Sequence, residues 1–374
     1  MANRWLDVEK LGQSLWYDNL GRSFIASDKL PGMIRDLGLR GITSNPAIFE
    51  RSISEGREYD ADIERCVREG MSTTAIYDRL TTDDVRAAAD VMRSVFDRTE
   101  GLDGYVSIEV DPRLANDTHG TLEAARRLWA MVGRPNVMIK IPGTPSGIPA
   151  IRTALREGIN INVTLLFGIE NYAAVAEAYI DALKERERHG ESVSGIASVA
   201  SFFLSRVDTN VDKLLQAQIS AGNTSASELL GKAAVANARL AFERYHTIFS
   251  GEAWASLAAK GARTQRCLWA SVSTKNPAYR DVMYIEPLIG PNTVTTVPDD
   301  TIAAFADHGV SADTLGSDMA GAHAVIDQLK ALGIDTERVA EELQIDGVQK
   351  FIDAFNTLIA KLDAKRAVIE GSIG

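Results

Sequence analysis

One lysine stands inside a short stretch that otherwise reads as a buried β-strand. The stretch is NVMIKIPGT, residues 136–144, and the lysine is Lys140, flanked by Ile139 and Ile141. At the ordinary lysine pKa of about 10.4, only about one amine in 2,500 is uncharged at pH 7, and only the uncharged amine attacks a carbonyl carbon. Burial disfavours the charged form and can lower a lysine pKa by about 3–5 units. We therefore expect Lys140 to form a Schiff base with a ketone or aldehyde.

Schiff-base formation and carbon–carbon cleavage also need groups that move protons. Three side chains near the ends of other apolar runs could serve, namely Asp18, Glu109 and Thr164. Further polar residues share faces or ends of such runs: Thr43, Asn45, Ser107, Asp111, Asn160, Asn162 and Ser271. A single buried polar residue is more often a structural hydrogen-bonding group. So many at equivalent ends favour one shared polar site, with a structural ion-pair network as the alternative.

The scaffold must bring several strand ends together. We expect eight strands, at 13–20, 40–49, 105–110, 136–141, 160–167, 195–203, 266–272 and 282–290. Helix-like segments lie between them, with apolar residues at three- and four-residue spacing and a closing glycine. Eight alternating units predict a closed (β/α)8 TIM barrel of the α/β class, in which the carboxyl ends of the strands carry the chemistry. A Rossmann-like sheet is the alternative, although no strand is followed by GxGxxG.

The chain is longer than such a barrel requires. It has 374 residues, whereas a (β/α)8 barrel typically takes about 250. We expect helical insertions at 50–104 and 225–262 and a helical C-terminal tail at 299–374. No linker-like tract or repeat divides the chain, so we predict one elaborated domain, residues 1–374.

Composition excludes several kinds of function. The formal net charge of −11 argues against non-specific binding to nucleic acid or to an anionic membrane, because both require a basic surface. No apolar run approaches 18 residues and the start of the chain is acidic, so we expect a cytoplasmic protein. The five histidines are scattered without HxH or HExxH, which argues against a metal centre, and GxSxG is missing. Cys66 and Cys267 are expected to be buried thiols.

Seven motifs, in order, resemble the transaldolase family in its longer bacterial form. They are YDNL, GITSNPAIF, VSIEVDPRLANDT, NVMIKIPGT, GININVTLLF, SFFLSRVD and LWASVSTKNPAYRD. The resemblance implies a (β/α)8 barrel without a metal or organic cofactor. It implies transfer of a dihydroxyacetone unit from a ketose phosphate (sedoheptulose 7-phosphate or fructose 6-phosphate) to an aldose phosphate (glyceraldehyde 3-phosphate or erythrose 4-phosphate) in the pentose phosphate pathway.

The resemblance also implies a role for each matching residue. Lys140 matches the Schiff-base lysine, Glu109 and Thr164 the pair that holds a catalytic water, and Asp18 the acid/base for the donor's C4 hydroxyl. Residues that match those near the dihydroxyacetone portion are Thr43, Asn45, Asn162 and Ser201.

The phosphate site departs from the family pattern at one position. Arg206 matches the family's phosphate arginine, but the second arginine that shorter members carry two residues after the position of Ser271 is Ser273 here. Lys275 is the candidate replacement, with a solvated loop charge as the alternative.

Two other functions stay open at this stage. Fructose 6-phosphate aldolases use the same lysine chemistry and release free dihydroxyacetone, but they are shorter and carry Gln at the position of Glu109 and Tyr at that of Phe203. A barrel that binds sugar phosphates without turnover would be expected to lose the lysine or the acid. The sequence leaves open whether the protein is a monomer or a homodimer.

Overall fold

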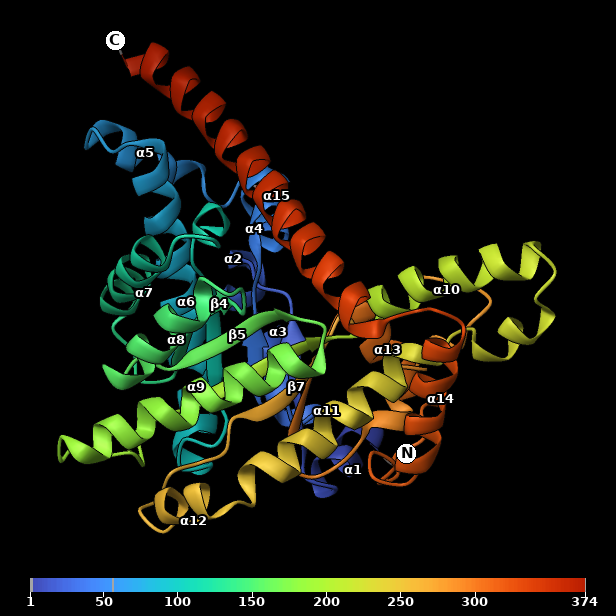
Figure 1. Cartoon of the computed structure of the whole chain (residues 1–374). Helices are drawn as coiled ribbons and strands as arrows, with labels where there is room; N and C mark the ends of the chain where they lie inside the picture. The colour runs from blue at the N-terminus through green and yellow to red at the C-terminus, as the bar shows by residue number, and fades with distance from the viewer. Residues whose placement is uncertain (1–2, 56, 374) are drawn as a thin grey trace.

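Eight parallel strands form a closed barrel at the centre of the computed structural model, which describes residues 3–55 and 57–373 (Figure 1). Each strand pairs with the next in the sequence, and β1 pairs with β8 to close the ring. This confirms the predicted (β/α)8 barrel. The strands are β1 Gln13–Asp18, β2 Gly41–Thr43, β3 Tyr105–Glu109, β4 Val137–Pro142, β5 Ile161–Leu166, β6 Ser198–Phe203, β7 Arg266–Ala270 and β8 Thr293–Val297.

The prediction of the eighth strand at 282–290 is wrong. That segment consists of turns and the short 3-10 helix η3 Glu286–Leu288, and the strand that closes the barrel follows it as β8. The segment is apolar because it is buried beside the barrel: the carbonyl of Leu288 accepts hydrogen bonds from Gln13 and Trp269. Its Pro287 has no N–H to give to a strand ladder. The second strand is also shorter than predicted, since Pro46 already begins a helix.

Helices surround the barrel and fill the segments predicted to be helical additions. Residues 50–104 contain α5 and α6, residues 225–262 contain α11 and α12, and the C-terminal tail contains α13 to α15. The helices are α1 Arg4–Lys10, α2 Arg22–Ala26, α3 Lys29–Asp36, α4 Pro46–Glu55, α5 Asp60–Arg68, α6 Thr73–Arg98, α7 Thr118–Val132, α8 Gly147–Arg156, α9 Ile169–Arg188, α10 Ser205–Ser220, α11 Ala233–Phe249, α12 Glu252–Ala258, α13 Asp299–His308, α14 Met319–Ala331 and α15 Thr336–Ile373, with 3-10 helices η1 Pro112–Leu114 and η2 Thr224–Leu229.

Local signals explain where several of these elements begin and end. The Asp117 side chain accepts a hydrogen bond from the Gly120 N–H at 3.0 Å and so caps the start of α7. Gly133, with φ of 61°, ends α7 in the left-handed conformation. In β2, a Cβ on Gly41 would lie 2.4 Å from the Trp16 ring, so this position requires glycine.

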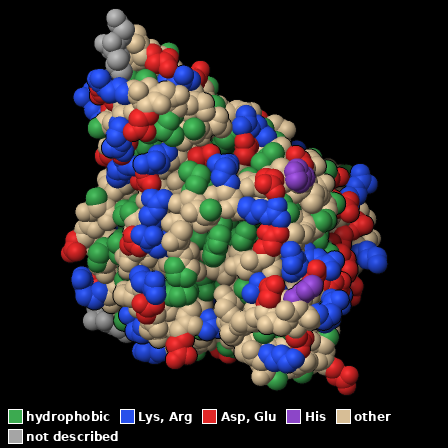
Figure 2. All heavy atoms as spheres, turned by 90° about the vertical axis from the view of Figure 1, so that its left-hand side faces the viewer, with side chains coloured by type: hydrophobic (Ala, Val, Ile, Leu, Met, Phe, Trp, Pro, Cys, Tyr) green, Lys and Arg blue, Asp and Glu red, His purple; other side chains and the backbone are tan. Residues whose placement is uncertain are grey.

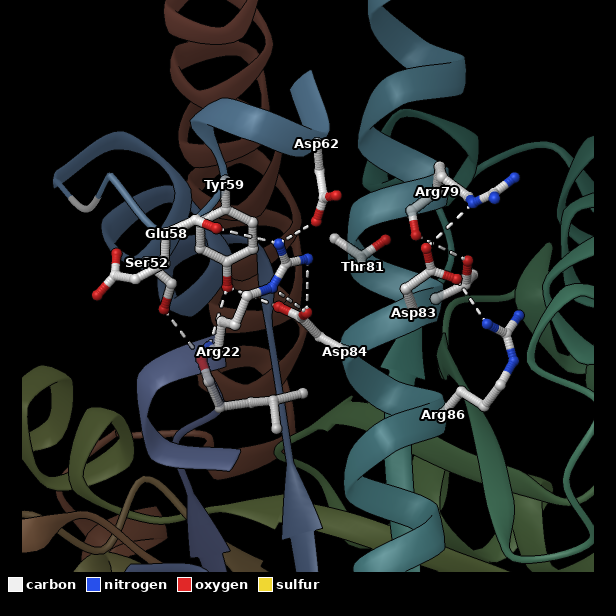
Figure 3. A network of polar contacts seen from close by, with 12 residues as sticks. Arg22, Ser52, Glu58, Tyr59, Asp62, Arg79, Thr81, Asp83, Asp84 and Arg86 are labelled. Carbon is white, nitrogen blue, oxygen red and sulfur yellow. Dashed lines mark hydrogen bonds and ion pairs between the residues drawn. The ribbon is translucent and has the colours of Figure 1, made fainter. Parts of the chain in front are cut away.

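A polar network ties the first insertion to the start of α2 (Figure 3). Arg22 donates from Nε and Nη2 to Asp84 at 3.0 Å, and Tyr59 donates to the same carboxylate at 2.6 Å. Arg22 also pairs with Asp62 of α5. The network therefore fastens α2, α5 and α6 to one another.

On the face drawn in Figure 2, acidic and basic side chains lie side by side and do not form patches of one sign. Ion pairs join neighbouring parts of the helical layer, for example Arg126 of α7 with Glu157 and Arg134 with Asp90 of α6. No helix in the described ranges is long and apolar enough to cross a membrane.

Candidate active site

Lys140 and Glu109 form an ion pair inside the barrel. The strand register places Glu109 of β3 beside Lys140 of β4, and Lys140 beside Asn162 of β5. Lys140 Nζ lies 3.3 Å from Glu109 Oε2 and donates to the Ser44 carbonyl at 3.2 Å. The side chains of Lys140 and Glu109 are only 6% and 3% exposed. The structure therefore encloses the amine at the predicted position.

Burial changes the acidity of both carboxyl groups near this amine. It raises the pKa of Glu109 to about 7, although the positive charge of Lys140 acts in the opposite direction. Burial also raises the pKa of Asp18, opposed by Lys140 and by the Thr43 hydroxyl, which donates to Asp18 at 2.9 Å. A carboxyl group whose pKa lies near neutrality exchanges its proton readily, as a general acid or base must. Both carboxyl groups are thus close enough to Lys140 to act with it.

A cavity of about 480 Å³ opens above the amine at the carboxyl ends of the strands. Nine of the twelve predicted site residues line it: Asp18, Thr43, Asn45, Lys140, Ser201, Phe203, Arg206, Ser271 and Lys275. The other three, Glu109, Asn162 and Thr164, are buried in the strands that form its floor. The structure therefore brings the whole predicted set to one end of the barrel.

Hydrogen bonds hold part of the floor in place and leave other groups unpaired. Asn162 donates to Ser107 Oγ at 3.1 Å and accepts from Ser201 at 2.7 Å. In contrast, Glu109 Oε1 and Thr164 Oγ1 are buried and have no hydrogen-bond partner in the described part of the chain. Because buried polar groups are normally paired, these two oxygens are available to a substrate or a water molecule.

Two cationic side chains stand at the mouth of the cavity. Arg206 lies in the first turn of α10, and its Nη1 is buried without a hydrogen-bond partner among the described residues. Lys275 is exposed in the loop after β7 and lies close enough to lower the pKa of Asp18. Ser271, which shares a 2.8 Å hydrogen bond with Ser205, has a φ of 55°, a strained conformation for a residue other than glycine.

Two of the further polar residues that the strand pattern singled out, outside these twelve, have structural roles. Asn160 precedes β5 and bridges neighbouring strands: it donates to the carbonyls of Pro135 and Val137 and accepts from the Ala197 N–H. Asp111 lies after β3, where it caps η1 and pairs with Arg113. Neither side chain lines the cavity.

Comparison with known proteins identifies the family. A family model described as Transaldolase/Fructose-6-phosphate aldolase matches residues 15–362. The chain belongs to this family. A protein named Transaldolase from Trichodesmium erythraeum is 47% identical over 372 residues, which cover 98% of each chain. Transaldolase 2 from Nostoc punctiforme is 47% identical over 376 residues (98% of this chain, 99% of the relative), and Transaldolase from Thiobacillus denitrificans is 45% identical over 356 residues (95% and 98%).

Sequence reasoning missed several cavity residues of this transaldolase-family chain. Thr296 of β8 shares a 2.6 Å hydrogen bond with Thr43. It was missed because the sequence pattern predicts the eighth strand at 282–290, before this residue. The run of β-branched residues at 293–297 was the signal that could have located it. Arg51 of α4 and Phe351 of α15 also line the cavity. The helical spacing around these two residues predicts that each lies on a helix, and it gives no sign that either side chain faces the cavity.

Proposed function

We propose that the protein is a transaldolase that moves a dihydroxyacetone unit from a ketose phosphate to an aldose phosphate through a Schiff base on Lys140. The donors are sedoheptulose 7-phosphate and fructose 6-phosphate, and the acceptors glyceraldehyde 3-phosphate and erythrose 4-phosphate. The observation that carries the proposal is the enclosed pair of Lys140 and Glu109, 3.3 Å apart, beneath a cavity with Arg206 at its mouth. The resemblance of the motifs adds the pentose phosphate pathway as the setting, and the expected location is the cytoplasm.

Formation of the Schiff base begins when the Lys140 amine attacks the C2 carbonyl of the ketose. The resulting carbinolamine must lose its hydroxyl as water, which requires a proton donor at the oxygen and a base at the nitrogen. Glu109, with its pKa raised to about 7 by burial, suits both tasks near neutral pH. The unpaired Oε1 of Glu109 and Oγ1 of Thr164 would hold the water that carries the proton.

The second carboxyl group, Asp18, serves in carbon–carbon cleavage. Asp18 takes the proton of the C4 hydroxyl, the C3–C4 bond breaks, and its electrons move into the iminium on Lys140 to give an enamine. The aldose product leaves and the acceptor aldose enters. The enamine carbon then attacks the acceptor aldehyde, Asp18 returns the proton to the new alkoxide, and water releases the new ketose from Lys140.

The two ends of the cavity would bind different parts of the substrate. Near the amine, the hydroxyl and amide groups of Thr43, Asn45, Asn162 and Ser201 would hold the dihydroxyacetone portion. At the mouth, Arg206, Ser271 and Lys275 would hold the phosphate, which needs local positive charge on a chain with a net charge of −11. The unpaired Nη1 of Arg206 supports this placement.

Transfer is favoured over simple cleavage by two residues. Glu109 and Phe203 stand at the positions where fructose 6-phosphate aldolases carry Gln and Tyr.

A coupled assay with fructose 6-phosphate and erythrose 4-phosphate tests the proposal: we expect sedoheptulose 7-phosphate and glyceraldehyde 3-phosphate as products. Release of free dihydroxyacetone at a comparable rate would make the protein an aldolase, and no turnover of either kind would indicate a binding protein.

A further inference from the structure

The longest helix of the protein crosses the mouth of the barrel. In Figure 1, α15 is the long red helix, and it contacts α4, η1, β5 and α10, which all lie at or follow the carboxyl ends of strands. Gln344 fixes it there: its Nε2 donates to the carbonyls of Gly143 and Leu165 at 3.1 and 3.0 Å. Glu337 accepts a hydrogen bond from the Ile169 N–H at 2.9 Å, so α15 also caps α9. The helix is therefore held over β4 and β5.

One side chain of α15 reaches the reacting nitrogen. Phe351 lines the cavity, is 8% exposed, and has its ring centroid 5.7 Å from Lys140 Nζ. The other groups in contact with the amine are polar, namely the Glu109 carboxylate and the Ser44 carbonyl. Phe351 is thus an apolar cover on the side of the amine that faces the mouth.

We propose that Phe351 is a specificity-determining residue, which limits the access of bulk water to the intermediate on Lys140 so that the intermediate passes to an aldose. The inference rests on the proposed function and adds a cause for transfer in place of cleavage. Apolar groups that exclude water from a site suppress side reactions of reactive intermediates. An aldose acceptor has hydroxyl and phosphate groups that bind the polar walls of the cavity and hold it near the enamine. Water has no such binding groups, so its reaction depends on how freely it reaches the intermediate.

The enamine on Lys140 has two possible fates. In transfer, its nucleophilic carbon forms a bond to the acceptor aldehyde carbon, and the aldehyde oxygen takes a proton. In release, the same carbon takes a proton to give the iminium of dihydroxyacetone, water adds to the iminium carbon, and the carbon–nitrogen bond breaks to regenerate the amine. Release before an acceptor has reacted requires a proton at the enamine carbon and then water at the iminium carbon, so removing the cover favours release.

A second phenylalanine on the same helix provides a matched control. Phe355 is 1% exposed and stacks edge-on against Tyr77 at 5.2 Å, while Arg113 lies 4.8 Å from its ring. It does not line the cavity. Phe355 anchors α15 through its contacts with Tyr77 and Arg113, so we expect its replacement to weaken the helix without exposing Lys140.

The experiment compares Phe351→Ala, Phe351→Leu and Phe355→Leu in the full chain. With fructose 6-phosphate and erythrose 4-phosphate, the measured quantity is the ratio of free dihydroxyacetone to transferred units. For Phe351→Ala we expect this ratio to rise about tenfold, equivalent to a change of about 1.4 kcal/mol between the two barriers. Phe351→Leu, which keeps an apolar cover, should give a smaller rise, and Phe355→Leu should keep the wild-type ratio.

Borohydride trapping in the same samples separates the two proposals. A trapped adduct on Lys140 in the wild type and in Phe351→Ala, together with an unchanged ratio, would overturn the role of Phe351 alone. An equal rise in Phe355→Leu would overturn it too, because helix position and not the ring would then matter. Absence of the adduct from the wild type would instead overturn the proposed function. Circular dichroism confirms that each variant is folded before the ratio is measured.

Discussion

Replacing Glu109 by Gln should flatten the pH dependence of the free energy of unfolding and lower the activity. Burial raises the pKa of Glu109 from 4.5 to about 7. Between these two values the folded protein holds a proton that the unfolded chain has released, so the free energy of unfolding falls as the pH rises. Glutamine has nearly the same shape and carries no charge at any pH. The variant should therefore lose this pH dependence.

The size of the effect follows from the two pKa values. The difference between 4.5 and about 7 corresponds to about 3 kcal/mol in full, because each pKa unit is worth about 1.4 kcal/mol. Most of it develops between pH 5 and pH 8, over which wild type should lose about 2–3 kcal/mol more of its free energy of unfolding than Glu109→Gln. The side chain is only 3% exposed, so solvent screens little of the effect.

Urea unfolding at pH 5, 6, 7 and 8 measures this difference, with transfer assayed alongside. The matched control is Glu341→Gln, which removes an exposed carboxylate of α15 and should follow wild type at every pH. Parallel curves for wild type and Glu109→Gln would refute the reasoning. So would full transfer activity in Glu109→Gln, because a carboxyl group in the proton path cannot be replaced by an amide without loss.

Three further predictions concern the ends of the site and the first insertion. Lys275→Ala should raise KM for fructose 6-phosphate about tenfold, the loss of one charge-assisted hydrogen bond, and leave KM for an unphosphorylated donor unchanged; steady-state kinetics with both donors would show an equal effect if Lys275 is only a solvated charge. Asp18→Asn should lower kcat by at least about 100-fold, yet still yield a borohydride adduct, and loss of the adduct would show that Asp18 acts earlier. Arg22→Met should lower the free energy of unfolding in urea by about 2–3 kcal/mol, since Asp84 is left buried without its cation, and a change in kcat would contradict its purely structural role.

Local rules account for how the candidate site residues come together. Alternation along a strand puts Asn162 and Thr164 on one face, and parallel pairing then sets Glu109 beside Lys140. Both rules hold without knowledge of the helices. Strand alternation and parallel pairing were therefore sufficient to place these residues near one another.

The rest depends on contacts between distant parts of the chain. Phe351 comes to the amine because α15 folds back across the barrel, and its own neighbours in the sequence carry no sign of this. Thr296 was missed because the apolar segment before it resembles a strand more than β8 does. Asn160 looks like Asn162 in the sequence, but it lies just before β5 and bonds to backbone, whereas Asn162 lies within the strand and bonds to the side chains of Ser107 and Ser201. Only tertiary packing separates these cases.

The central claim is that the amine of Lys140 bonds covalently to a ketose. Incubation with fructose 6-phosphate, reduction with borohydride and mass spectrometry of the intact protein and its peptides test it most directly. The account predicts one dihydroxyacetone-derived adduct, located on Lys140 and missing from Lys140→Ala. An unmodified wild-type protein, or an adduct on another lysine, would contradict it.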